Sequence, residues 1–338
     1  MKIVKLRFSS ALHLSKGKPS YDTSDELLHS DTLKSAIFVA ACSAMPNKAN
    51  EEFFRSFHVS SAFPYWGEEL FFPKPLKHNL SFVEDANEPQ LKSIKKIEWV
   101  GREIFNEIIS GGKQEMSKTL LIAGDSILST TVKELDRRKR KELVIWKRDV
   151  TQRVRVPNDK TEESMPFFLD KIFFVENAGL YFILETGDNN LNFILNAINV
   201  LGKTGIGLQR NIGNGQFEIE SVNDFSFPEP DKPNACLNLS LFCPNDKKEL
   251  TPMLSNNCAY RLIERGGWLS SPMDEAHITL RKKTITMFKE ASVFGCNTEG
   301  GNVFTLGNDL IDLKPEDRKD IGHSIWRDGK AIFLKMKL

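Results

Sequence analysis

The most constraining feature of the chain is a glycine-rich segment between a predicted helix and a predicted strand. Residues 205–217 hold two Gly-x-Gly pairs, Gly205/Gly207 and Gly213/Gly215, around a polar bridge centred on Arg210. Residues 191–201 have the apolar content of a buried helix, and residues 216–222 alternate like a strand. Glycine lacks Cβ, so this segment can adopt positive φ angles and bring backbone N–H groups close to an anion.

The segment differs from the two familiar nucleotide-binding loops. A phosphate loop of the NTPase kind needs Gly-Lys-Ser/Thr, whereas Gly207 is followed by Leu208 and Gln209. A dinucleotide loop follows a strand and precedes a helix, which is the reverse of the order here. The segment therefore predicts an anion cradle for a longer phosphate chain such as RNA, with a mobile linker as the alternative. Its predicted contact residues are Lys203, Gly205, Gly207, Gln209, Arg210, Asn211, Gly213 and Gly215.

A basic cluster lies between Lys133 and Arg155. Lysine plus arginine at 46 against aspartate plus glutamate at 45 gives a net charge of only +1, which is weak for a protein that binds nucleic acid alone. The 23 residues of the cluster, however, contain ten basic and four acidic side chains, a local net charge of +6. Such a cluster attracts a polyphosphate backbone. The alternative is a solvated charged face.

Composition indicates a cytoplasmic globular protein without cofactor or metal. Of 338 residues, 40% are hydrophobic and 27% are charged, which is enough for one or two domains. No signal peptide is apparent, and no apolar run approaches the roughly 18 residues of a membrane span. Five cysteines without a Cys-x-x-Cys pair predict buried free thiols rather than a zinc site or a disulfide framework.

The helix, glycine segment and strand resemble the RAMP superfamily of CRISPR proteins. Further segments, in the same order along the chain, are similar to the Csm subunit-four family of type III-A effector complexes. They are residues 1–8, 12–14, 28–33, 60–65, 70–75, 179–182, 260–262, 265–268, 287–294 and 323–331. No single segment decides the matter, but their number and order are specific.

The resemblance implies an α+β fold of two ferredoxin-like (RRM-like) domains with antiparallel sheets. The first domain, 1–225, is expected to contain strand 2–8, helix 32–45 capped by Ser30 or Asp31, a hairpin of 171–175 and 180–185, helix 190–201 and a strand from 216. A proline-rich connector, 227–233, marks the boundary to the second domain, 226–338. The second domain is expected to contain helix 247–254 and strands 236–242, 259–263, 284–287, 303–306 and 331–335.

A long insertion, about 76–167, is expected in the first domain. It contains alternating stretches at 143–147 and 150–156 before a polar tip at 157–164. In the family the corresponding segment includes a thumb-like β-hairpin. The family pattern there usually contains Val-Asp-Arg, whereas residues 151–155 read Thr-Gln-Arg-Val-Arg. The predicted RNA contacts in this part are Lys147, Arg148, Arg153 and Arg155.

Residues His29, Ser30, Asp31 and Thr32 have three alternative interpretations. Serine, aspartate and threonine are typical of a helix N-terminus, which can also direct its positive end at phosphate. The same neighbours can orient a histidine for acid–base catalysis. His29, Ser30 and Asp31 are therefore predicted RNA contacts with a structural alternative. His13, His58, His78 and His277 have no recognisable partner in the sequence, and a structural role is expected for His323.

The resemblance implies a non-catalytic RNA-binding subunit in antiviral defence. It would cap one end of the effector complex and hold the repeat-derived 5′ handle of the guide RNA. Its other expected partners are the large polymerase-like/HD subunit, the first copy of the repeated backbone subunit, and target RNA near the handle junction. Two alternatives stay open: a metal-independent RAMP endoribonuclease that processes guide RNA, and an adaptor that contacts protein only.

Overall fold

Strand β1 (Lys2–Phe8) lies inside a sheet that separates two hydrophobic cores. Successive side chains of a strand point to opposite faces. Val4 and Leu6 accordingly join one core, while Ile3 joins the other. The computed structural model describes residues 1–15, 22–83, 91–134, 137–157, 163–254, 257–269, 280–295, 298, 300–306 and 324–338.

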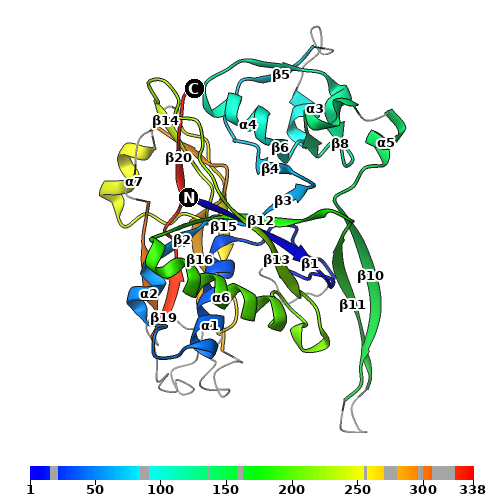
Figure 1. The fold of residues 1–338 in the computed structure, drawn as a ribbon, viewed down its shortest axis with the longest axis vertical. Helices are drawn as coiled ribbons and strands as arrows, with labels where there is room; N and C mark the ends of the chain where they lie inside the picture. Colours follow the sequence, from blue (N-terminus) through cyan, green and yellow to red (C-terminus); the bar gives the residue numbers. More distant parts are fainter. Residues whose placement is uncertain are drawn as a thin grey trace.

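The N-terminal part of the sheet is antiparallel and runs in the order β13-β1-β12-β3, with β2 also paired to β12. Its strands are β2 (Phe57–Val59), β3 (Phe63–Trp66), β12 (Ala178–Thr186) and β13 (Phe217–Asp224). Helices α1 (Ser30–Ala44) and α6 (Asp188–Thr204) cover one face (Figure 1). Their apolar side chains pack there against β1 and β12. This connectivity agrees with the β-α-β-β-α-β arrangement expected for the first unit. The short helix α2 (Glu51–Arg55) precedes β2.

The residues after β3 extend the sheet and enclose the second core. Strands β4, β6, β9 and β8 continue the sheet in that order, and β5 pairs with β7 in parallel. A stacked pair, Phe72 and Phe105, lies inside this core with ring centroids 4.5 Å apart. The elements are β4 (Glu69–Pro73), β5 (Leu80–Phe82), α3 (Leu91–Lys96), β6 (Trp99–Gly101), α4 (Arg102–Ile109), β7 (Gln114–Met116), η2 (Lys118–Leu120), β8 (Leu121–Ile122), β9 (Ile127–Leu128), η3 (Thr131–Glu134) and α5 (Arg137–Glu142).

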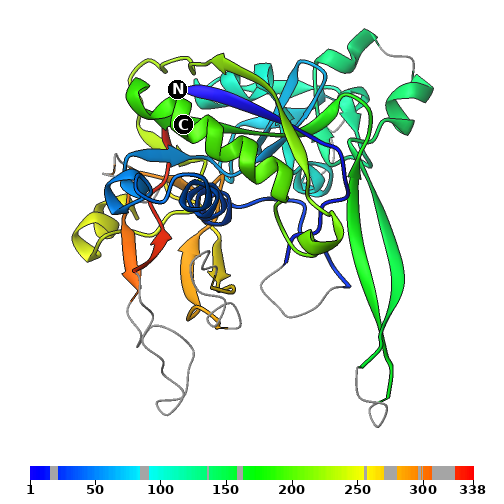
Figure 2. The same cartoon turned by 60° about the horizontal axis from the view of Figure 1, so that its bottom comes forward.

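A long hairpin projects from the body of the protein (Figures 1 and 2). It consists of β10 (Trp146–Arg155) and β11 (Met165–Phe174), paired antiparallel from Trp146↔Phe174 to Arg155↔Met165. The sequence predicted two alternating stretches here, and the structure has one continuous strand, β10. The predicted hairpin of 171–175 with 180–185 is wrong, because β11 pairs with β10 while β12 pairs with β1, β2 and β3.

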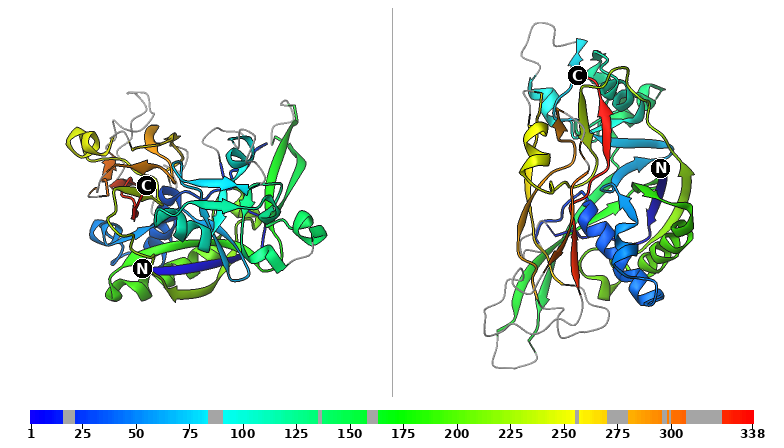
Figure 3. Two further views of the ribbon diagram at one scale, coloured as in Figure 1. Left: turned by 90° about the horizontal axis from the view of Figure 1, so that it is seen from above. Right: turned by 90° about the vertical axis from the view of Figure 1, so that its left-hand side faces the viewer.

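The C-terminal half consists of small antiparallel sheets in the part that the structure describes. They are β17-β14-β20, β15-β16 and β18-β19. Leu237 and Leu334 of the first sheet join the same core as Phe72, so the two halves share a hydrophobic interior. Figure 3 shows β20 (red) beside the N-terminal half of the chain (blue to green). The elements are β14 (Ala235–Asn238), α7 (Lys247–Met253), β15 (Leu262–Arg265), β16 (Ile285–Phe288), β17 (Val293–Phe294), β18 (Val303–Leu306), β19 (Ile325–Asp328) and β20 (Phe333–Met336).

Candidate nucleic-acid interface

The glycine segment folds back on itself at the end of α6. Gly205, Gly207, Gly213 and Gly215 all have positive φ angles, between +74° and +91°. A Cβ at Gly205 or Gly215 would overlap a backbone carbonyl of the same segment, so these turns require glycine. The N–H of Ile206 donates to the carbonyl of Gly215 at 2.9 Å and closes the fold.

Three of the four glycine amides bond within the protein. Gly205 donates to the carbonyl of Leu201 at 2.7 Å, Gly213 to Arg210 at 3.0 Å, and Gly215 to Ala11 at 2.7 Å. This differs from the cradle of glycine amides expected from the sequence, because the end of α6 and the turn use these donors internally. RNA contact at this segment is still a prediction, but it would depend on side chains.

The side chains at the tip of the segment are exposed, and one of them, Arg210, is basic. The short helix η4 (Arg210–Ile212) presents Arg210, Asn211 and Ile212 to solvent, and Ile212 is 54% exposed. Lys203 is exposed on the last turn of α6, and Gln209 is half-buried. The segment therefore offers two cations and an amide on a small protrusion.

Residues 11–14 link the glycine segment to the base of the long hairpin. Leu208 donates to the carbonyl of His13 at 2.9 Å on one side of this strap. On the other side, Leu12 and Ile172 exchange two backbone hydrogen bonds of 2.8 Å each. The predicted glycine segment and the hairpin of β10 and β11 are therefore neighbours in the structure.

Arg148 anchors the base of this hairpin. Its guanidinium binds the carboxylate of Asp170 at 2.7 Å and that of Glu26 at 2.6 Å. It also donates to the carbonyl of Ser24 at 3.1 Å. These contacts satisfy most of the fork of Arg148, so its geometry fits a positioning role better than contact with phosphate.

The hairpin has a basic face and a face that is uncharged toward the tip. Paired residues of an antiparallel ladder project to the same side, and successive residues alternate. Lys147, Arg153 and Arg155 therefore share one face with their partners, Phe173, Phe167 and Met165. The register adds Lys171, opposite Asp149, to this face. Sequence reasoning missed Lys171 because its face is known only once β11 is paired with β10.

The opposite face of the hairpin is uncharged toward the tip. Val150, Val154 and Phe168 are 57%, 54% and 52% exposed. Val154 pairs with Pro166, and Gln152 pairs with Phe168. Such an exposed apolar strip on an edge element is typical of a contact surface rather than of a free surface.

His29 lies buried between the two halves of the chain. Its Nδ1 is 2.8 Å from a carboxylate oxygen of Glu290, which also accepts a hydrogen bond from the Ser61 hydroxyl. Its Nε2 is 3.6 Å from Asp25. Burial disfavours the imidazolium, but the charge of Glu290, the hydrogen bond to it and the nearby carboxylate of Asp25 outweigh burial and raise the pKa of His29 to about 9.

Ser30 and Asp31 likewise contact the C-terminal half. Asp31 and Arg265 form a buried ion pair of 2.8 Å, and the guanidinium also binds the Thr32 hydroxyl. The Ser30 hydroxyl accepts from the N–H of Leu241 at 2.9 Å. The prediction that Ser30 or Asp31 caps the helix is wrong, because α1 begins at Ser30 with His29 as N-cap and no side-chain cap bond. These contacts favour the structural interpretation of the tetrad, and RNA contact there is an untested prediction.

The remaining histidines and cysteines do not assemble a metal site in the described ranges. His13 contacts the carbonyl of Asp170 at 2.5 Å, and His78 accepts from the N–H of Leu80 at 3.1 Å. No cluster of histidine, cysteine, aspartate and glutamate suited to a metal occurs among the described residues. Cys42, Cys236, Cys243 and Cys258 are free thiols, of which only Cys236 is fully buried, while Cys296, His277 and His323 lie outside the described residues. Within the described ranges, none of the helices has the length and apolarity that crossing a bilayer requires.

Comparison with known proteins gives consistent matches over the whole chain. Residues 231–336 match the model of the CRISPR Csm4 C-terminal domain. The chain is 30% identical over 288 residues to the CRISPR system Cms protein Csm4 of Thermococcus onnurineus strain NA1. That alignment covers 83% of this chain and 86% of the relative.

Solved structures share the fold along the full length. A chain of the Csm3–Csm4 subcomplex of the type III-A CRISPR-Cas interference complex superposes with a TM-score of 0.66 and 18% identity, and the match covers 100% of both chains. A chain of the Csm1–Csm4 cassette in complex with pppApA gives a TM-score of 0.61 and 17% identity, covering 100% of this chain and 98% of the other.

Proposed function

The chain belongs to the Csm4 family of type III-A CRISPR effector subunits, and from this premise we propose that it holds the 5′ handle of the guide RNA without catalysing a reaction. The observation that carries the proposal is the adjacency of the glycine segment and the long hairpin through residues 11–14. Together they offer cations from two elements that lie far apart in the sequence.

In the proposed mechanism, basic side chains bind the phosphates of the handle RNA, and its bases stack on planar side chains. Lys203 and Arg210 would bind handle phosphates at the glycine segment. Lys147, Arg153 and Arg155 would continue the path along the basic face of the hairpin. Unpaired bases of single-stranded RNA can stack on aromatic and guanidinium planes, and Phe173, 42% exposed, lies on that face.

The proposed protein partners are taken from the solved structures that share this fold. One of these structures contains Csm3 with Csm4, and the other contains Csm1 with Csm4. We infer that this chain docks a large subunit and the first copy of a backbone subunit through ferredoxin-like domains. The long hairpin would act as the thumb, with its outer end at the start of the guide–target duplex.

The non-catalytic assignment is supported by the surroundings of His29. A general acid or base must reach its substrate. The imidazole of His29 is 3% exposed and lies between Asp25 and Glu290. If the chain were instead a nuclease that uses His29, it would cleave repeat RNA, and the His29→Ala variant would not.

The test is ultraviolet crosslinking with mass spectrometry on the complex assembled with a guide RNA of defined 5′ handle. We expect handle crosslinks to residues 203–217 and to 147–155. Handle crosslinks confined to other subunits would refute RNA binding by this chain and leave it as a protein adaptor.

A further inference from the structure

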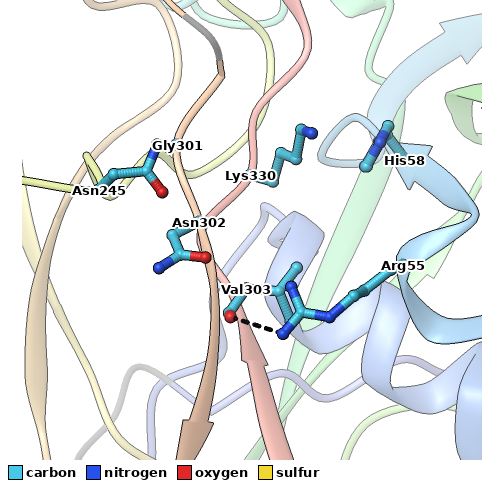
Figure 4. Close-up of a pocket in the computed structure, with 7 residues that line it drawn as sticks. All are labelled: Arg55, His58, Asn245, Gly301, Asn302, Val303 and Lys330. Atoms are coloured by element: carbon cyan, nitrogen blue, oxygen red, sulfur yellow. Dashed lines mark hydrogen bonds between the residues drawn. The ribbon is translucent and has the colours of Figure 1, made fainter. Parts of the chain in front are cut away.

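A pocket of about 290 Å³ lies between the two halves of the chain and shares no residue with the proposed RNA surface (Figure 4). The N-terminal half contributes Arg55 at the end of α2 and His58 in β2. The C-terminal half contributes Asn245, Asn302 and Lys330. The pocket is therefore formed only when the halves are packed together.

The pocket lining is cationic. None of its lining residues carries a carboxylate. The described part of the chain shows no ion pair for Lys330, whose side chain is drawn beside the pocket together with Arg55 and Asn302 (Figure 4). Arg55 is held in place by Glu51 at 2.9 Å and by the carbonyl of Val303 at 3.3 Å. Glu185 pairs with His58 across the strands but is not part of the lining.

His58 carries a polar atom without a partner at this site. Its Nδ1 is buried and has no hydrogen bond among the described residues. Burial, followed by the charges of Lys34 and Lys330, lowers the pKa of His58 to about 4. The ring is therefore neutral at pH 7 and can direct one N–H at a bound anion.

Lys330 is positioned by the segment 323–331, one of those similar to the Csm subunit-four family, of which residues 324–331 are described. Asp328 binds the buried Lys34 at 2.9 Å, and the N–H of Gly329 donates to the carbonyl of Asn302 at 2.8 Å. Both contacts fix the backbone on the N-terminal side of Lys330. The backbone that carries the cation is thus held at the pocket by contacts with both halves of the chain.

We propose that this pocket binds a phosphate group, carried either by single-stranded RNA or by a free nucleotide. Arg55, His58, Lys330 and the amide of Asn302 are four donor groups around one space. A carboxylate or an internal phosphodiester offers two charged oxygens, whereas a terminal phosphate, on a nucleotide or at the end of an RNA strand, offers three terminal oxygens to such a set. The chemistry therefore favours phosphate over the side chain of an acidic protein partner.

The test uses the full-length chain and isothermal titration calorimetry with AMP and with a short single-stranded RNA. Lys330→Gln and Arg55→Gln should each weaken the binding of a phosphate probe about tenfold or more, because each removes a charge-assisted contact. Lys48→Gln, which removes an equal charge from an exposed position outside the pocket, should leave affinity unchanged. Circular dichroism and thermal melting verify that the variants are folded.

The source of the phosphate is decided by which probe responds. Binding of AMP that depends on Lys330 assigns the pocket to free nucleotides, and loss of affinity for RNA alone assigns it to a strand phosphate. Equal affinities of Lys330→Gln and Lys48→Gln for both probes would overturn the proposal. So would Lys330-dependent binding of an oligoglutamate peptide in the absence of binding to either phosphate probe. The AMP arm is independent of the handle-binding surface, so either idea can fail alone.

Discussion

Replacing Lys147, Arg153 and Arg155 with alanine removes three cations from one face of the long hairpin and leaves its base contacts in place. Arg148 is excluded because it binds Asp170 and Glu26, and its loss would disturb the hairpin itself. Each phosphate contact to single-stranded RNA contributes roughly 0.7 to the slope of log K against log salt concentration. Three contacts therefore contribute about 2 units of slope, and roughly a 50-fold change in affinity at about 0.15 M salt.

The assay is fluorescence anisotropy of a labelled handle RNA titrated with the full chain at several salt concentrations. The control replaces Lys232, Lys247 and Lys248, three exposed lysines of the C-terminal half, with alanine. We expect the hairpin variant to show lower affinity and a shallower salt dependence than the control. Identical slopes for the two variants would show that the basic face of the hairpin does not contact RNA.

Three further predictions concern stability. Arg265→Ala leaves its buried carboxylate partner on α1 unpaired and should lower the free energy of unfolding by about 3–5 kcal/mol, measured by urea denaturation. The pKa of His29 is raised in the folded state, so the stability that its protonated ring contributes is complete below about pH 6.5 and is lost as pH rises through about 9. The urea midpoint of the parent chain should therefore fall between these pH values, and in His29→Gln this fall should be smaller. Gly215→Ala combines a positive φ with overlap of a backbone carbonyl, so it should destabilise more than Gly213→Ala, which has a positive φ of 83° but open space and should cost about 1–2 kcal/mol. Equal melting temperatures for the two glycine variants would contradict this reading of the turn.

The structure confirms the elements whose sequence pattern lies within one continuous segment of the chain. Strand 2–8 is β1 as predicted, and helix 190–201 lies within α6. In both, the spacing of apolar residues within the segment itself indicates the type of secondary structure. The prediction that 171–175 pairs with 180–185 is wrong, since the true partner of β11 is reached across the hairpin tip.

The sequence by itself determined which residues are basic, which segments need glycine and which family the motifs resemble. It also placed Arg153 and Arg155 at alternating positions of one predicted stretch, because a strand has a period of two. Only the tertiary structure decided that three of the four glycine amides are used internally and that His29 contacts Glu290 of the C-terminal half. The pocket lined by Arg55, His58 and Lys330 likewise exists only in the tertiary structure, because its residues come from both halves of the chain. Contacts between distant segments depend on how the halves pack, and no local spacing in the chain encodes that packing.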